Sequence, residues 1–250
     1  MTERPQLPDT IRACLFDLDG VLTATAKVHA AAWKEMFDDF LRSWAERHGE
    51  RFVPFDPVRD YDEYVDGLPR EDGTRGFLRS RHIDLPAGGD DDPPGAQTVH
   101  ALSERKNTLV LERIKAGGVA AYPGSVRFLR AVRAAGLPTA VVSSSANCAD
   151  VVRSVGLDQM LDVRVDGIVA KQEHLAGKPA PDTFLAAAGK LGVEPAAAAV
   201  FEDALAGVAS GKAGKFGYVV GVDRVGQADE LREHGADIVV TDLGDLLVES

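Results

Sequence analysis

The sequence has 250 residues, 45% of them hydrophobic and 27% charged, proportions that are ordinary for a globular protein. Its formal net charge of -11 repels phosphate backbones and anionic headgroups, so nucleic acid and membrane surfaces are excluded as expected partners. The segment MTERPQLPDT has no apolar core of signal-peptide length, and no apolar run is long enough to span a membrane. Two cysteines, Cys14 and Cys148, are too few for a disulfide framework. We therefore expect a cytoplasmic protein whose cysteines are structural thiols.

Short apolar segments alternate with helical patterns through most of the chain. The predicted strands are residues 11–16, 139–142, 163–165, 198–201, 218–222 and 238–240. The helical patterns between the later strands are residues 149–155, 182–191, 205–213 and 227–234. Apolar strands that alternate with helices predict an α/β fold, in which helices cover both faces of a parallel sheet.

The segment between the first and second predicted strands is different, because it contains no convincing strand. Large apolar residues recur there at helical spacing: Trp33, Met36, Phe37, Phe40, Leu41 and Trp44. Further helical patterns follow at residues 70–81 and 98–115, and PAGGDDDPPGAQ (residues 86–97) is expected to be a solvated loop. We therefore predict a catalytic core of residues 1–24 and 118–250, with residues 25–117 inserted as a helical cap domain.

Charged and hydroxyl side chains follow the predicted strands, where ligands collect in parallel sheets. The first strand ends in FDLDG, the second in VVSSSAN and the fourth in FEDALAG, and GKPAPD precedes the helix at 182–191. These segments bring four carboxylates and one lysine to the same edge: Asp17, Asp19, Glu202, Asp203 and Lys178. Carboxylates so close together would raise one another's pKa unless a cation offsets their charge.

A divalent cation resolves this repulsion, and the hard oxygen ligands favour Mg²⁺. A carboxylate such as Asp17 can then attack phosphorus and form an aspartyl-phosphate. Asp19, two residues further on, can transfer the proton of the attacking or leaving oxygen. The cation and Lys178 would neutralise the charge of the transferred phosphoryl group. The sequence therefore favours one nucleophile and one acid/base in the motif FDLDG.

Each motif taken alone has an ordinary structural explanation. An isolated D-x-D is more often a turn, the serines can cap a helix, and the Glu-Asp pair can be solvated. The occurrence of all these motifs at predicted strand ends favours an active site.

Three other motifs are disfavoured. Asp90, Asp91 and Asp92 lack the ligand spacing of a calcium-binding loop. GVASGK is one residue short of a phosphate loop, and the glycines at 211, 214 and 217 lack dinucleotide-binding spacing.

The four segments, in this order, resemble the motifs of the haloacid dehalogenase superfamily of phosphoryl-transfer enzymes. Within that superfamily the chain most resembles the beta-phosphoglucomutase-like family, and the likeness covers nearly its whole length. It rests on DGVLTATAKVHAAAW, GLPRED, SERKN, YPG, SSSAN, GKPAPDTF and EDALAG. The resemblance implies a Rossmann-like core with a mobile helical cap. It also implies a small phosphorylated sugar as partner, and we expect a monomer.

The resemblance implies a role for each matching residue. Asp17 would be the nucleophile and Asp19 the acid/base, while Ser143 and Lys178 would hold the transferred phosphoryl group. The implied Mg²⁺ ligands are Asp17, Glu202, Asp203 and the backbone carbonyl of Asp19. The implied sugar and distal-phosphate ligands are His29, Gly67, Arg70, Lys106, Asn107, Ser145 and Asn147. Trp33 shares a helix face with His29 and is expected to be a packing residue.

The implied reaction converts beta-glucose 1-phosphate to glucose 6-phosphate through a bisphosphate. Two positions depart from the pattern: Ala24 stands where relatives usually have Asp, and Ala146 where some mutases have Lys. The second change removes a positive charge near the distal phosphate, so a phosphatase acting on a small sugar phosphate is the alternative. Dehalogenation of small acids is disfavoured, because it needs neither a metal nor Asp19. A non-catalytic sugar-phosphate binder is disfavoured because candidates for every motif are present.

Overall fold

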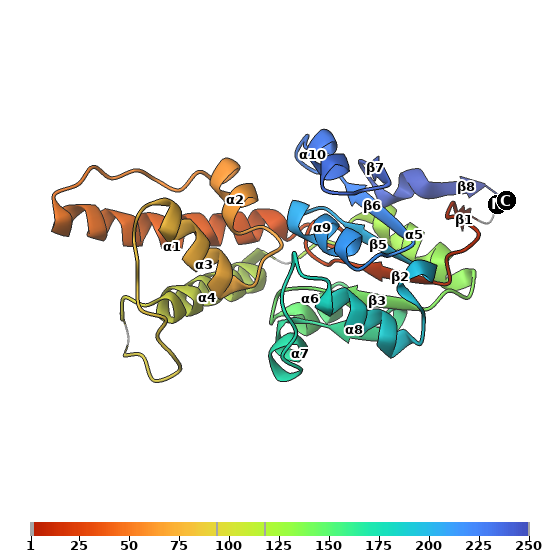
Figure 1. Ribbon diagram of the computed structural model, residues 1–250, viewed down its shortest axis with the longest axis horizontal. Coiled ribbons are helices and arrows are strands. Elements are labelled where there is room, and N and C mark those ends of the chain that lie inside the picture. The colour runs from red at the N-terminus through yellow and green to blue at the C-terminus, as the bar shows by residue number, and fades with distance from the viewer. Residues whose placement is uncertain (1–2, 94, 118, 250) are drawn as a thin grey trace. The chain divides into compact units, whose positions relative to one another are not determined.

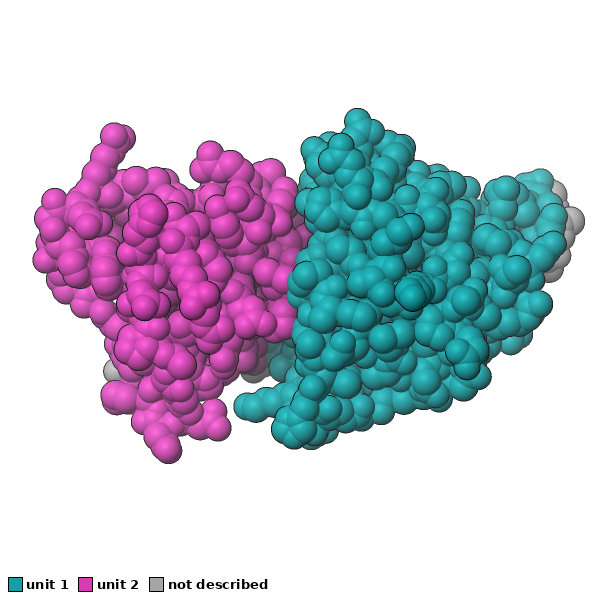
Figure 2. Space-filling view, viewed as in Figure 1, with its two compact units in different colours: residues 1–24, 119–250 teal, residues 25–118 magenta. Residues whose placement is uncertain are grey.

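The computed structural model describes residues 3–93, 95–117 and 119–250, and divides into two compact units. Residues 1–24 and 119–250 form unit 1, and residues 25–118 form unit 2 (Figure 2). Gly118, where we expected the second junction, and Pro94, in the Asp-rich loop, lie outside the described residues. In the described part of the chain, no helix is both long and apolar enough to cross a membrane.

Unit 1 is built on a parallel six-stranded sheet with the order β4-β3-β2-β5-β6-β7. Its strands are β2 (Ala13–Phe16), β3 (Thr139–Val142), β4 (Val163–Val165), β5 (Ala198–Glu202), β6 (Tyr218–Val222) and β7 (Ile238–Val240). These confirm the six predicted strands and the α/β fold class. The central strands are buried along their whole length, as apolar strands covered on both faces must be.

Helices cover both faces of this sheet (Figure 1). They are α5 (Pro123–Ala134), α6 (Cys148–Ser154), α7 (Gly167–Gln172), α8 (Asp182–Leu191), α9 (Leu205–Ala213) and α10 (Ala228–Glu233). Leu15 of β2 packs with Phe184 of α8 on one side. Phe16 lies on the alternate face, where its ring stacks on Phe201 at 4.6 Å and meets Phe128 of α5 edge-on at 6.2 Å. Cys14 and Cys148 are free buried thiols, as expected.

The parallel register fixes the position of the acidic residues. Phe16 of β2 pairs with Phe201 of β5, and the N–H of Asp17 donates to the carbonyl of Phe201 at 2.9 Å. The residues that follow Phe16 and Phe201 therefore lie next to each other at the carboxyl-terminal edge of the sheet. On the other side of β2, Phe16 pairs with Val141 of β3, so residue 143 leaves the sheet beside them.

A short antiparallel ribbon in unit 1 was not predicted. It pairs β1 (Glu3–Pro5) with β8 (Leu247–Glu249). Each strand has three residues and mixes charged residues with Pro or Leu, so neither shows the alternation that predicts a strand. Helix α7 was also missed; it begins where Asp166 accepts hydrogen bonds from the N–H groups of Ile168 and Val169.

Unit 2 consists of α1 (Ala26–His48), α2 (Arg59–Tyr64), α3 (Arg70–Ser80) and α4 (Val99–Gly117). The predicted apolar stripe on α1 packs against residues of the later helices, and Phe37 lies 4.2 Å from Phe77 between ring centroids. Trp33 is buried and stacks on Phe37, which confirms it as a packing residue. Helix α1 ends at Gly49, whose φ of 68° is the left-handed conformation typical of a helix C-terminus.

Candidate active site

Three carboxylates meet at the carboxyl ends of β2 and β5. Asp17 follows β2, Glu202 ends β5 and Asp203 comes next. One oxygen from each lies within 4.8 Å of the others, and all three residues are buried. The parallel register explains this convergence, because Asp17 and Glu202 are the first residues beyond the paired Phe16 and Phe201.

Lys178 lies between two of these carboxylates. Its Nζ donates to Asp17 Oδ1 and to Glu202 Oε1, each at 2.5 Å, and to the carbonyl of Val142 at 3.3 Å. Its side chain is 1% exposed, and the ammonium also lies 5.0 Å from the centroid of the Phe184 ring. A buried lysine is stable in this position because it is paired and hydrogen-bonded.

The charges of this cluster do not balance. Burial raises the pKa of Asp17 to about 6, although Lys178 opposes that shift. Burial likewise raises the pKa of Glu202 to about 7. Burial alone would lower the pKa of Lys178, but Asp17 and Glu202 together hold it above its ordinary value. With Asp203 included, one ammonium faces three carboxylates, so the donor set fits a divalent cation that prefers hard oxygen ligands, such as Mg²⁺.

Two glycines allow the carboxylates to lie against the backbone. A β-carbon on Gly20 would lie 1.7 Å from Asp203 Oδ2, and one on Gly207 would lie 1.8 Å from Glu202 Oε1. Glu202 also accepts a hydrogen bond at 2.9 Å from the N–H of Ala204, which precedes α9. A side chain at either glycine would displace the neighbouring carboxylate.

Asp19 lies on a tight turn that follows β2. The turn is closed by the N–H of Gly20, which donates to the carbonyl of Thr23 at 2.7 Å, and by a bridge between Asp19 and Thr23. Asp19 is partly exposed, whereas Asp17 is buried. Its charge is close enough to contribute to the raised pKa of Asp17, after the larger effect of burial. The two aspartates of the motif therefore have different environments.

The hydroxyl residues after β3 form a chain of backbone contacts. Ser143 Oγ accepts from the N–H of Ser145 at 3.1 Å, and Ser145 Oγ accepts from the N–H of Asn147 at 3.1 Å. Ser143 is buried, while Ser145 and Asn147 are half-buried. Asn147 directly precedes α6, and Ala146 beside it is exposed. These residues follow β3 at the same edge of the sheet as Asp17.

Unit 2 brings its own predicted residues together. Lys106 Nζ lies 3.0 Å from His29 Nδ1 and 4.7 Å from the centroid of the Trp33 ring. Lys106 is buried, and Asn107 follows it on α4. Burial lowers the pKa of His29 well below its ordinary value, and the charges of Lys106 and Arg70 act in the same direction. His29 is therefore held neutral beside a buried ammonium.

Arg70 begins α3 and is paired with a residue that was not predicted. Its Nη2 lies 2.5 Å from Oε1 of Glu104, on α4. Gly67, three residues earlier, lies between α2 and α3 with a φ of 68°, in the left-handed region that favours glycine. Glu104 stands in the motif SERKN, two residues before Lys106, and a spacing of two on a helix gave no signal for its pairing with Arg70.

Two polar residues at the edge of the sheet were also missed. Arg224 Nε donates to the carbonyl of Gly20 at 2.8 Å, and Gln227 Nε2 donates to the carbonyl of Asp203 at 3.0 Å. Both follow β6, so the same strand-end rule that selected the other segments could have found them.

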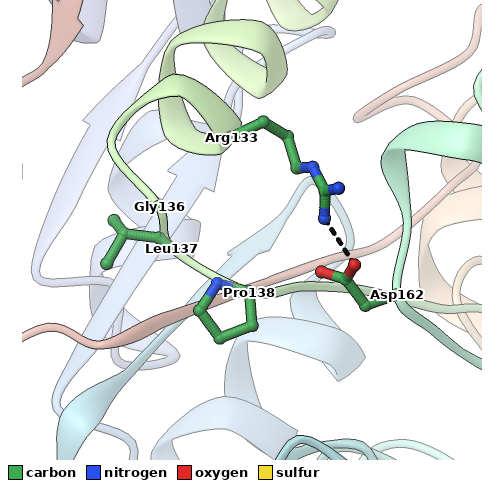
Figure 3. Close-up of a pocket in the computed structure, with 5 residues that line it drawn as sticks. All are labelled: Arg133, Gly136, Leu137, Pro138 and Asp162. Atoms are coloured by element: carbon green, nitrogen blue, oxygen red, sulfur yellow. Dashed lines mark hydrogen bonds and ion pairs between the residues drawn. The ribbon is translucent and has the colours of Figure 1, made fainter.

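A pocket lined by Arg133, Gly136, Leu137, Pro138 and Asp162 contains none of the predicted site residues (Figure 3). It precedes β3 and β4 and so lies at the opposite ends of the strands.

The pattern of the family described as "haloacid dehalogenase-like hydrolase" matches residues 11–215. The chain belongs to this family. It is 59% identical over 244 residues to the beta-phosphoglucomutase of Mycobacterium bovis, covering 96% of this chain and 93% of that protein. A solved beta-phosphoglucomutase from Clostridium difficile superposes with a TM-score of 0.73 at 25% identity, covering 94% and 93% of the two chains. A solved hydrolase from Pseudomonas syringae gives a TM-score of 0.74 at 25% identity, covering 94% and 95%.

Proposed function

We propose that this protein is a Mg²⁺-dependent phosphotransferase that converts beta-glucose 1-phosphate to glucose 6-phosphate through glucose 1,6-bisphosphate. The observation that carries the proposal is the 59% identity to a beta-phosphoglucomutase over 96% of this chain, which includes both units. The buried cluster of Asp17, Glu202, Asp203 and Lys178 supports it, because it supplies a carboxylate nucleophile next to a cationic group.

Asp17 is the proposed nucleophile. A carboxylate oxygen of Asp17 attacks the phosphorus at C1 of the bisphosphate, and the bond between phosphorus and the C1 oxygen breaks. Asp19 donates a proton to that oxygen as glucose 6-phosphate leaves. In the other half of the cycle Asp19 takes the proton of the C6 hydroxyl of beta-glucose 1-phosphate as that oxygen attacks phospho-Asp17. The number of protons and phosphoryl groups is therefore unchanged over the cycle.

Asp17, Glu202, Asp203 and the backbone carbonyl of Asp19 are the proposed ligands of Mg²⁺. When bound, the ion would offset the charge of the carboxylates and of the transferred phosphoryl group. Lys178 contributes a second positive charge that the protein holds permanently, since its Nζ is fixed by two carboxylates. Ser143 is proposed to hold the phosphoryl oxygens with Lys178.

Recognition of the sugar and its distal phosphate is assigned to the remaining predicted residues. They are His29, Gly67, Arg70, Lys106, Asn107, Ser145 and Asn147. The buried ammonium of Lys106 and the guanidinium of Arg70 are suited to an anionic group. The Lys106 ammonium donates to Nδ1 of the neutral His29, so Nε2 carries the ring proton and can donate a hydrogen bond to a sugar oxygen. We propose that the enzyme works in the cytoplasm as a monomer.

A phosphatase on the same scaffold is the second candidate. In that reaction water, not a sugar hydroxyl, takes the phosphoryl group from Asp17. The exposed Ala146 favours this alternative, because it puts no positive charge beside Ser145 and Asn147. Likeness to a solved hydrolase at a TM-score of 0.74 is consistent with either reaction.

A product assay distinguishes the two candidates. The protein is incubated with Mg²⁺, beta-glucose 1-phosphate and a trace of glucose 1,6-bisphosphate, and both glucose 6-phosphate and free phosphate are measured. We expect glucose 6-phosphate to form with little free phosphate. Free phosphate without glucose 6-phosphate would overturn the mutase and support the phosphatase. Repetition across hexose and pentose phosphates identifies the preferred sugar.

A further inference from the structure

The loop between β6 and α10, residues 223–227, leaves the sheet beside the acidic cluster. Gly221 of β6 pairs with Glu202 of β5, so the residues after each strand emerge next to one another. The loop is anchored to the next strand as well, because the N–H of Asp223 donates to the carbonyl of Val240 at 2.8 Å. Of this loop, only Gln227 was included in a predicted element, as the first residue of the helical pattern at residues 227–234.

The loop has a fixed shape. Asp223 Oδ1 accepts hydrogen bonds from the N–H groups of Val225, Gly226 and Gln227 at 3.1, 2.6 and 3.0 Å. An aspartate that binds the following backbone in this way holds a turn without regular secondary structure. The side chains of Arg224 and Gln227 therefore start from defined positions.

Arg224 connects this loop to the turn that carries Asp19. Its Nε donates to the carbonyl of Gly20 at 2.8 Å, and Gly20 directly follows Asp19. The guanidinium is fixed from the other sides, since Nη1 donates to the carbonyl of Thr241 at 2.8 Å and the Tyr122 ring centroid lies 3.7 Å away. The side chain is 16% exposed, so the contact with Gly20 is largely shielded from water.

Gln227 connects the same loop to the segment that carries Asp203. Its Nε2 donates to the carbonyl of Asp203 at 3.0 Å. An oxygen of the Asp203 carboxylate lies within 4.8 Å of one oxygen each of Asp17 and Glu202. The loop 223–227 therefore binds the backbone of both acidic segments, at Gly20 and at Asp203. These two residues are also in close contact with each other.

We propose that Arg224 and Gln227 are positioning residues, with Arg224 fixing Asp19 for proton transfer and Gln227 fixing Asp203 for Mg²⁺. This inference rests on the proposed function. Neither residue touches the reacting atoms; each acts through a backbone carbonyl. Groups that orient the ligands of a metal commonly change its affinity, or the activity, by about 10- to 100-fold when they are removed.

Two pairs of variants test the proposal. Gln227→Met removes the donor at similar length, and Gln227→Asn keeps a neutral amide donor on a side chain one methylene shorter. Arg224→Met removes the hydrogen bonds of the guanidinium to Gly20, Thr241 and Asp242, and Arg224→Lys keeps a positive charge and a donor for one of them. Matched controls are Gln159→Met and Arg232→Met, because both residues are exposed and donate hydrogen bonds to neighbouring aspartates of their own helices. Thermal melts select a temperature at which every variant is folded.

The first readout is the Mg²⁺ dissociation constant of the metal-free, substrate-free protein, measured by titration calorimetry. We expect Gln227→Met to weaken Mg²⁺ binding by about tenfold or more and Gln227→Asn to recover part of it. The second readout is the product assay over a range of pH. We expect Arg224→Met to lower kcat by about tenfold, with little change in KM and a displaced pH profile, and Arg224→Lys to recover part of the rate.

Mg²⁺ affinity and kcat equal to those of the control variants, with or without a lower melting temperature, would overturn the inference. That result differs from failure of the proposed function, in which the unmodified protein itself neither binds Mg²⁺ nor transfers a phosphoryl group. In that case neither the proposed function nor the roles of Arg224 and Gln227 would hold.

Discussion

Gly20 and Asp203 lie so close together that the Asp203 carboxylate occupies the space in which a side chain at position 20 would begin. A β-carbon on Gly20 would lie 1.7 Å from Asp203 Oδ2, and Gly20 has a φ of 87°. The turn after β2 and the segment after β5 are thus packed directly on each other. A short side chain at this point would move a proposed Mg²⁺ ligand.

Gly20→Ala is therefore expected to weaken Mg²⁺ binding and abolish most activity. It should also destabilise the fold by about 1–3 kcal/mol, because it forces a non-glycine residue into the left-handed region. Calorimetric titration and thermal melts measure both effects. Gly49→Ala is the matched control, since Gly49 has a φ of 68° with nothing within 4 Å of its added β-carbon. It should cost about 1–2 kcal/mol in stability while Mg²⁺ affinity is unchanged. Equal Mg²⁺ affinity in both variants would contradict the steric argument.

The stabilisation by Mg²⁺ should increase with pH. In the metal-free protein the pKa of Asp17 is about 6 and that of Glu202 about 7, above their ordinary values of 3.8 and 4.5. The folded chain therefore binds protons more tightly than the unfolded chain. The resulting stability is fully present below pH ~4 and is lost as pH rises through about 6 and 7. Because Mg²⁺ competes with these protons, we expect it to raise Tm more at pH 8 than at pH 5.5.

Thermal melts in EDTA and in saturating Mg²⁺ at the two pH values check this difference. Asp203→Asn serves as the control, since it removes a proposed ligand and should shrink the Mg²⁺-induced rise at both pH values. A rise in Tm that is equal at both pH values, or larger at pH 5.5, would contradict the account.

Glu104→Gln is expected to lower KM for the sugar phosphate by a few-fold while kcat changes little. Glu104 pairs with Arg70 at 2.5 Å, and an anionic substrate group would have to compete with it for the guanidinium. The effect is small because the ion pair is partly exposed, and such pairs are worth about 0.2–1 kcal/mol. Steady-state kinetics measure it. Glu112→Gln, an exposed position on the same helix, makes the same change in net charge; equal KM values for the two variants would remove Glu104 from this role.

His29 should make the protein less stable in acid. Burial and the charges of Lys106 and Arg70 hold the pKa of His29 well below 6.5, so the unfolded chain binds a proton that the folded chain rejects. Stability from this group is therefore lost as pH falls below about 6.5. We expect His29→Gln to lose less stability than the unmodified protein between pH 7 and 5 in denaturant titrations. The exposed His234→Gln should behave like the unmodified protein; a parallel pH dependence for His29→Gln would contradict the prediction.

The sheet could be predicted from sequence because its strands are short apolar runs between helical patterns. The gathering of Asp17, Lys178, Glu202 and Asp203 followed from one rule, that parallel strands end at a common edge, and the structure brings them together. The strands β1 and β8 could not be found, since ERP and LVE mix charged residues with Pro or Leu and are neither apolar throughout nor alternating.

The sequence pattern did not predict which contacts the loop side chains make. Arg224 reaches Gly20 across 204 positions of the chain, and the pairing of Arg70 with Glu104 depends on how α3 and α4 pack. Local spacing determines helices and strands, but it contains no information about which loop side chain lies against which carbonyl. The rule that ligands collect at strand ends can select residues such as Arg224, but the atoms that they contact are known only when the register and the turns are known.

The account depends on a phosphoryl group carried by Asp17, and trapping that group is the most direct test. The protein is mixed with Mg²⁺ and glucose 1,6-bisphosphate, quenched in acid and digested, and the peptides are analysed by mass spectrometry. We predict one phosphorylated peptide, with the group on Asp17, and none in Asp17→Asn, which should also lack phosphoryl transfer. Turnover that continues in Asp17→Asn, or a phosphoryl group on another residue, would contradict the account.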